Sequence, residues 1–169
     1  MAVTSSWMCS STSLVTTASA DVALKGLSYL LEAMAKLRTE RDVRLTIIGR
    51  PRPGHSMDLI HSLGLEPHID FVSGVPDERI VELYAEAELA VVPSLYEGFS
   101  LPAVEAMATG TCLVATDGGA LPEVTGTDGD EAHAVEGHAH VLVDVLDAVL
   151  ADHHDARHPR GHLALHVDE

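Results

Sequence analysis

Two glutamates eight positions apart lie in the part of the chain that is richest in residue types with chemical functions. Glu97 precedes Gly98 in a predicted loop, and Glu105 lies about one turn into a helix predicted over residues 102–109. A carboxylate accepts two hydrogen bonds, so it suits adjacent hydroxyls of a ribose or another sugar. Gly98 lacks a Cβ and lets a ligand approach the backbone, and free amides at the helix start favour an anion. The pattern predicts a ligand that carries both sugar and phosphate, whereas a glutamate near a helix start also stabilises the helix by itself.

The elements that must position these glutamates alternate between short apolar runs and amphipathic stretches. Strands are predicted over residues 14–17, 43–49, 69–72, 89–92 and 112–115, and helices over residues 25–38, 57–63, 77–87 (capped by Asp77) and 102–109. Apolar strands with helices between them are typical of a parallel sheet that is covered on both faces. The predicted fold class is therefore α/β, with a Rossmann-like, doubly wound parallel sheet of about five strands. In such sheets, ligands bind beyond the carboxyl ends of the strands.

The composition changes near Gly126. Eight of the eleven histidines follow this residue, as does half of the net charge of −16. We expect a disordered segment over residues 1–13, a Rossmann-like domain over residues 14–126, and a divergent tail over residues 127–169 with one amphipathic helix. The apolar face of that helix consists of Leu142, Val145, Leu146, Val149 and Leu150. Histidines at 154, 158, 162 and 166 have helical spacing, but Pro159 and Gly161 disfavour a helix there, so a solvated tail is expected in place of a metal site.

Charge, hydropathy and cysteine content exclude several classes of partner. A net charge of −16 argues against nucleic acid or an anionic membrane, because phosphates would be repelled. No stretch reaches the ~18 uninterrupted apolar residues that span a bilayer. Cys9 and Cys112 are far apart and predict neither a disulfide framework nor a zinc site, which favours a cytoplasmic location. No Lys or Arg precedes the Ala-Ser-Ala run at residues 18–20, so we expect no signal peptide.

The run from Glu97 to Ala108, Glu-Gly-Phe-Ser-Leu-Pro-Ala-Val-Glu-Ala-Met-Ala, resembles a known signature. It is similar to the Glu–seven residues–Glu motif of the retaining glycosyltransferases of family 4, also called group 1. Further segments with the family's character follow in the same order, at residues 24–27, 45–49, 72–75, 83–88 and 116–123. The resemblance covers about residues 14–126. It implies the C-terminal lobe of the two-lobed GT-B fold, which binds the nucleotide-sugar donor.

The resemblance also implies roles for individual residues. Lys25 would contact the donor diphosphate and stabilise its charge as it leaves, although a lysine at a helix start is by itself more often solvated. Glu97 would hold the transferred sugar, and Glu105 the ribose hydroxyls. The donor-binding backbone would come from Gly98, Phe99, Ser100 and Leu101, and the base would lie near Val75. Gly118 and Gly119 are expected to form a turn, and neither a cofactor nor a metal is implied.

Two departures from the family pattern concern activity. The family usually has an arginine shortly before the lysine, but no basic residue precedes Lys25 here. Only about a dozen residues precede the first predicted strand, so we also expect the acceptor-binding lobe to be missing. Because transfer requires both substrates to be held together, we expect weak donor binding and inefficient transfer without a separate N-terminal lobe. A fragment, a truncated gene product or half of a split enzyme would account for the missing lobe. A shifted reading frame after Gly126 would account for the change in composition there.

Three functions fit these observations. The first is a glycosyltransferase that moves a sugar from a nucleotide-diphosphate-sugar to an acceptor, represented by its donor-binding half. The second is a nucleotide-sugar epimerase of the same fold. The third is a non-catalytic nucleotide-binding or interaction domain, which the missing lobe and the missing arginine favour. The order of the segments around Glu97 and Glu105 favours the glycosyltransferase.

Overall fold

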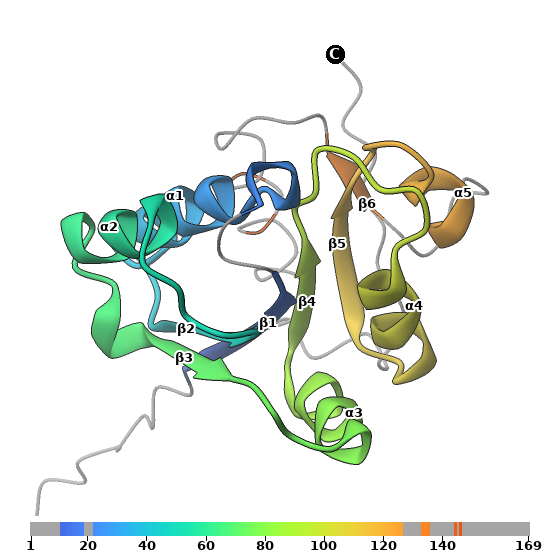
Figure 1. Cartoon of the computed structure of the whole chain (residues 1–169), viewed down its shortest axis with the longest axis horizontal. Helices are drawn as coiled ribbons and strands as arrows, with labels where there is room; N and C mark the ends of the chain where they lie inside the picture. Colours follow the sequence, from blue (N-terminus) through green and yellow to red (C-terminus); the bar gives the residue numbers. More distant parts are fainter. Residues whose placement is uncertain (1–10, 19–21, 127–132, 136–143, 145, 147–169) are drawn as a thin grey trace, which may run out of the picture.

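The computed structural model describes residues 11–18, 22–126, 133–135, 144 and 146. In this part of the chain, parallel strands form a six-stranded sheet in the order β3-β2-β1-β4-β5-β6 (Figure 1). The strands are β1 (Thr12–Thr17), β2 (Val43–Ile48), β3 (Ile69–Val72), β4 (Leu89–Val92), β5 (Cys112–Thr116) and β6 (His133–Val135). The order reverses direction between β1 and β4. Loops that follow these two strands therefore flank the switch point at which doubly wound folds bind ligands.

The helices cover both faces of the sheet, which confirms the predicted α/β, Rossmann-like architecture. They are α1 (Leu27–Leu37), α2 (His55–Ser62), α3 (Asp77–Glu86), α4 (Leu101–Ala108) and α5 (Leu121–Thr125), with 3-10 turns η1 (Ala23–Lys25) and η2 (Glu66–His68). Figure 1 shows α1 and α2 on one face, and α3, α4 and α5 on the other. In the part of the chain that the structure describes, no helix combines the length and the apolar character needed to cross a bilayer.

Alternate residues of each strand face the two helical layers, as the pleat of a strand requires. In β4, Leu89 and Val91 pack in the core beneath α1, whereas Ala90 and Val92 pack in the core beneath α3 and α4. Helix α1 buries Leu27, Leu30, Leu31, Ala33, Met34 and Leu37. This continuous apolar stripe holds α1, and with it the turn that begins the helix, firmly against the sheet.

Each strand and helix predicted before Gly126 forms, with boundaries that differ by no more than two residues. Strand β1 starts at Thr12, so Thr12 and Ser13 lie in the sheet and not in a disordered segment, because they pair in register with Val43 and Arg44 of β2. The expectation that Asp77 caps a helix was wrong. Pro76 occupies the cap position with an extended backbone, and Asp77 lies in the first turn of α3, where its charge still favours the helix.

The sheet continues past the change in composition at Gly126. Strand β6 pairs in parallel with β5, with Val114 opposite His133. Leu146 is fully buried in the core beneath α1, and Asp144 is exposed, as the predicted amphipathic helix requires. The other residues of that predicted helix and the four evenly spaced histidines lie outside the described residues, and a division of the chain at residue 126 stays a prediction.

Candidate functional site

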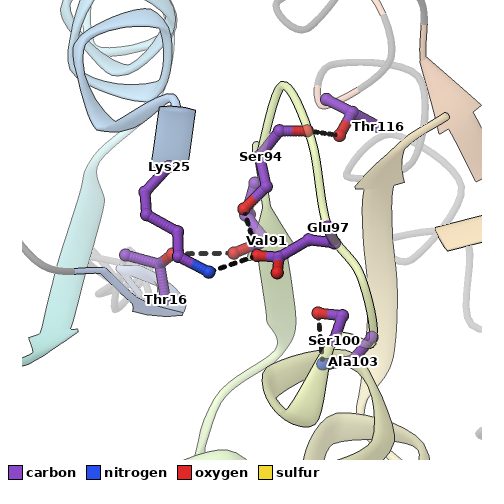
Figure 2. A network of polar contacts seen from close by, with 8 residues as sticks. All are labelled: Thr16, Lys25, Val91, Ser94, Glu97, Ser100, Ala103 and Thr116. Atoms are coloured by element: carbon purple, nitrogen blue, oxygen red, sulfur yellow. Dashed lines mark hydrogen bonds and ion pairs between the residues drawn. The ribbon is translucent and has the colours of Figure 1, made fainter. Parts of the chain in front are cut away.

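Two loops meet at the switch point between β1 and β4. The first carries η1 and its last residue, Lys25, and the second follows β4 and carries Glu97. They are joined by a backbone hydrogen bond in which the amide of Leu95 donates to the carbonyl of Leu24 at 2.8 Å. Residues 72 positions apart in the sequence therefore approach each other at the carboxyl ends of adjacent strands (Figure 2).

Gly26 permits this close approach. Its φ of 64° lies in the left-handed region, and a Cβ at this position would lie 1.7 Å from the carbonyl oxygen of Pro93. No other residue type fits there without moving one of the two loops, because both the backbone conformation and the space exclude a side chain. The Lys-Gly sequence is thus needed to place Lys25 beside the residues that follow β4.

The Glu97 carboxylate is held by two donors on the same oxygen. Lys25 Nζ lies 2.5 Å from Glu97 Oε1, and Ser94 Oγ donates to that oxygen at 2.7 Å. Glu97 is buried, with 7% of its surface exposed, whereas the side chain of Lys25 is one-third exposed. A buried carboxylate without partners would be costly, so the ion pair and the hydroxyl together stabilise its charge at this position.

The backbone of Glu97 is held by the loop that follows β5. Its amide donates to the carbonyl of Gly118 at 3.2 Å, and its carbonyl accepts from the amide of Ala120 at 2.8 Å. A Cβ on Gly118 would lie 2.6 Å from Leu95 O, and a Cβ on Gly119 would lie 2.3 Å from Glu97 O. The two glycines therefore do more than form the predicted turn, because their lack of side chains lets one loop lie directly against the other.

Threonine hydroxyls attach the end of β4 to both neighbouring strands. Thr16 Oγ1 donates to Val91 O at 2.7 Å, and Thr116 Oγ1 donates to the carbonyl of Ser94. These residues and Ser94 have no role in the sequence prediction. In the sequence, these three residues are recognisable only as hydroxyl residues near the carboxyl ends of predicted strands. Their contacts could not be predicted from this pattern, because it does not show which strands pair.

Glu105 lies on α4, a helix that packs closely because Ala103 and Ala106 are fully buried. Ser100 caps this helix, and its Oγ accepts from the Ala103 amide at 3.4 Å. Glu105 is half-buried, and its carboxylate lies near the phenol of Tyr84. Burial raises the pKa of Tyr84 to about 12, the hydrogen bond between Tyr84 and Thr17 opposes this shift, and the negative charge of Glu105 adds to it.

The family model described as "Glycosyl transferases group 1" matches residues 12–161. The chain belongs to this family. The match spans the change in composition at Gly126, as the sheet does. Among the three functions that fit the sequence, membership of this family favours the first.

Curated glycosyltransferases are similar in sequence to this chain over most of its length. The chain is 52% identical over 138 residues to an MMP alpha-(1->4)-mannosyltransferase of Mycolicibacterium hassiacum, covering 81% of this chain and 33% of that protein. It is 35% identical over 137 residues to a D-inositol 3-phosphate glycosyltransferase of Corynebacterium diphtheriae, covering 76% of this chain and 32% of that protein. The chain thus spans about a third of the length of the relatives that it matches.

Solved structures share the fold of this chain. A sucrose-phosphate synthase from Thermosynechococcus elongatus aligns with a TM-score of 0.72 and 27% identity, over 83% of this chain and 37% of that chain. The C-terminal domain of a group 1 glycosyltransferase from Francisella tularensis aligns with a TM-score of 0.69 and 26% identity, over 83% and 76% of the two chains. Anabaena Alr3699/HepE, in complex with UDP-glucose, has the same fold, with a TM-score of 0.70 and 24% identity over 83% and 40%.

The predicted site residues fall into two groups. Lys25 and Glu97 are in direct contact, and Glu105 lies on the helix that follows the same loop. Gly98, Phe99 and Ser100 also lie in the loop between β4 and α4, and Leu101 is the first residue of α4. A Cβ added to Gly98 would have no neighbouring atom within 4 Å, and Phe99 and Leu101 are more than 60% exposed. Val75 belongs to the other group, since it follows β3 at the edge of the sheet and is half-buried.

Proposed function

We propose that this lobe binds the diphosphate and the sugar of a nucleotide-sugar donor, as the C-terminal half of a retaining glycosyltransferase. The observation that carries the proposal is the contact between Lys25 and Glu97 at the switch point of the sheet. It brings a cation suited to a diphosphate and an acceptor suited to sugar hydroxyls to one position.

The chemistry of transfer gives each group a task. Cleavage of the bond between sugar and diphosphate leaves negative charge on the departing nucleoside diphosphate. Lys25, held in advance beside that position, would stabilise the charge as it develops. Glu97 would accept hydrogen bonds from the sugar, and Glu105 would accept them from the ribose. The amides of Gly98, Phe99, Ser100 and Leu101, at the start of α4, would bind the phosphate and sugar oxygens.

The acceptor would be held by a second, N-terminal lobe. The relatives are about three times as long as the part that this chain matches, which leaves room for such a lobe in them. The loops around the switch point also present exposed apolar side chains that a second lobe would cover; they are Val22, Leu24, Leu95, Tyr96, Phe99 and Leu101. Transfer by the whole enzyme would depend on this lobe, because it places the acceptor against the donor.

Two further features complete the proposal. The 52% identity to a mannosyltransferase makes a mannose-bearing donor the first to test, and the UDP-glucose bound by Alr3699/HepE makes a glucose-bearing donor the second. A cytoplasmic location is part of the proposal, because Cys9 and Cys112 are far apart in the sequence and form no CxxC motif.

Calorimetric titration of the purified chain tests the proposal. The probes are GDP-mannose, UDP-glucose, GDP and UDP. We expect at least one sugar-bearing nucleotide to bind, and we expect Glu105→Gln to weaken binding about tenfold because the ribose loses a charged acceptor. Glu32→Gln on the exposed face of α1 is the matched control and should bind as the wild type does. Absence of binding to all four probes at millimolar concentration would contradict the proposal and favour a non-catalytic interaction domain.

A further inference from the structure

The two oxygens of the Glu97 carboxylate have different surroundings. Oε1 receives both donors, Lys25 Nζ at 2.5 Å and Ser94 Oγ at 2.7 Å. Both polar contacts drawn to this carboxylate in Figure 2 end on the same oxygen. Within the described residues, no hydrogen bond or ion pair is recorded for Oε2. The carboxylate is therefore anchored through one oxygen and has the other available for a ligand.

Donor binding requires Lys25 to change its partner. In the unliganded chain Lys25 neutralises Glu97, whereas in the proposed complex its ammonium group contacts the diphosphate. A carboxylate that is only 7% exposed would then lose most of its compensation. Hydroxyl hydrogen bonds to a charged oxygen are among the stronger ones in proteins, so a second donor on Oε1 can preserve the geometry of Glu97 during this exchange.

Ser94 is placed to be that second donor. It is 2% exposed, so solvent does not compete for its hydroxyl. Its carbonyl accepts the Thr116 hydroxyl from β5, and its own hydroxyl bonds a residue of the same loop, three positions away. Lys25, in contrast, reaches Glu97 from a different loop with a long and partly exposed side chain. The contact with Ser94 is thus independent of any movement of Lys25.

We infer that Ser94 is a positioning residue, which holds Glu97 Oε1 when Lys25 turns to the diphosphate and so keeps Oε2 directed at the donor sugar. The inference rests on the proposed function. A positioning role of Ser94 predicts different effects on sugar binding and on diphosphate binding, whereas a purely structural role does not. Loss of the Ser94 hydroxyl should weaken the contribution of the sugar to binding and leave the contribution of the diphosphate unchanged.

Calorimetry on the whole chain measures this distinction with two probe pairs, GDP-mannose against GDP and UDP-glucose against UDP. For each pair, we divide the affinity for the nucleotide sugar by the affinity for the nucleoside diphosphate, and this ratio measures the contribution of the sugar. We expect Ser94→Ala to reduce this ratio about tenfold, because one hydrogen bond to a charged group is lost. Where the wild-type ratio is less than about ten, we expect it to fall to one. The affinity for the nucleoside diphosphate alone should stay within about twofold of the wild type, since Lys25 remains in place. Ser62→Ala on α2, which removes an exposed hydroxyl bonded to Leu59 O, is the control and should keep the ratio.

A second substitution guards against a folding defect. Ser94→Cys is nearly equal to serine in size but is a weak donor, so it should reduce the ratio as Ser94→Ala does. Ser94→Thr retains the hydroxyl and should restore at least part of the ratio. A ratio that survives in both Ser94→Ala and Ser94→Cys would overturn the inference and leave the proposed function intact, as would an equal loss of affinity for both members of a pair. A wild-type chain that binds none of the probes would contradict the proposed function, and the inference with it.

Discussion

The loop between β4 and α4 and the helix α4 itself hold their glutamates by different means. Glu97, in the loop, is buried and is held by Lys25, by Ser94 and by the backbone of the loop that follows β5. Glu105, on the helix, is half-buried and lies near the neutral phenol of Tyr84. Contacts from three separate segments position Glu97, whereas regular helix geometry positions Glu105. Substitutions far from Glu97 in the sequence should therefore disturb it, and Glu105 should be much less sensitive to them.

The largest effect should come from the turn that carries Lys25. Gly26→Ala places a methyl group 1.7 Å from Pro93 O, and we expect it to lower the free energy of unfolding by more than about 4 kcal/mol. Gly64→Ala is the matched control, because Gly64 has the same φ of 64° with no atom within 4 Å of an added Cβ. It should cost only about 1–2 kcal/mol, from backbone strain alone. Urea denaturation of both variants gives the comparison, and equal losses would show that contact with Pro93 is unimportant.

The loop that follows β5 should have the next largest effect. Gly119→Ala places its Cβ 2.3 Å from Glu97 O, and we expect a loss of about 3 kcal/mol together with weaker binding of a nucleotide sugar. Gly110→Ala has a φ of 71°, close to the 70° of Gly119, but no neighbouring atom within 4 Å. Denaturation and calorimetry on this pair separate strain in the backbone from displacement of Glu97. Donor binding that is unchanged in Gly119→Ala would contradict the role of this loop.

The two partners of the ion pair should differ in their effect on stability. Lys25→Met leaves the buried Glu97 carboxylate with Ser94 as its recorded donor, and we expect a loss of about 2 kcal/mol. Glu97→Gln leaves a lysine that is one-third exposed and can turn to solvent, so it should cost less than about 1 kcal/mol. Chemical denaturation at pH 7 measures both values. The opposite order would mean that the charge of Glu97 is not buried in solution.

The smallest effect concerns Tyr84 and is seen only in alkali. Its pKa is raised from the ordinary 10 to about 12 in the folded chain, so the folded state binds the phenolic proton more tightly than the unfolded state does. The resulting stability is fully present below pH 10 and is lost as the pH rises towards 12. Thermal denaturation between pH 9 and pH 12 should show a shallower loss of stability for Tyr84→Phe than for the wild type. Parallel curves would exclude burial of this phenol.

The different environments of the two glutamates also explain how well the sequence predicts the position of each. Helical spacing and a first-turn proline locate Glu105, since these signals are local. The contacts of Glu97 depend on Ser94, Gly118 and Gly119, whose loops become neighbours only when β4 and β5 pair. Local reasoning also assigned the helix cap to Asp77, although the cap position belongs to Pro76. Sequence patterns therefore predicted strands β1 to β5 and helices α1 to α4, but not β6, α5 or the packing between loops that holds Glu97.

A crystal structure of this chain with a bound nucleotide sugar is the most direct test of the account. It should show Lys25 Nζ on the diphosphate, Glu97 Oε2 on the sugar with Ser94 still bonded to Oε1, and Glu105 on the ribose. A donor bound elsewhere, with the pair between Lys25 and Glu97 intact, would contradict it.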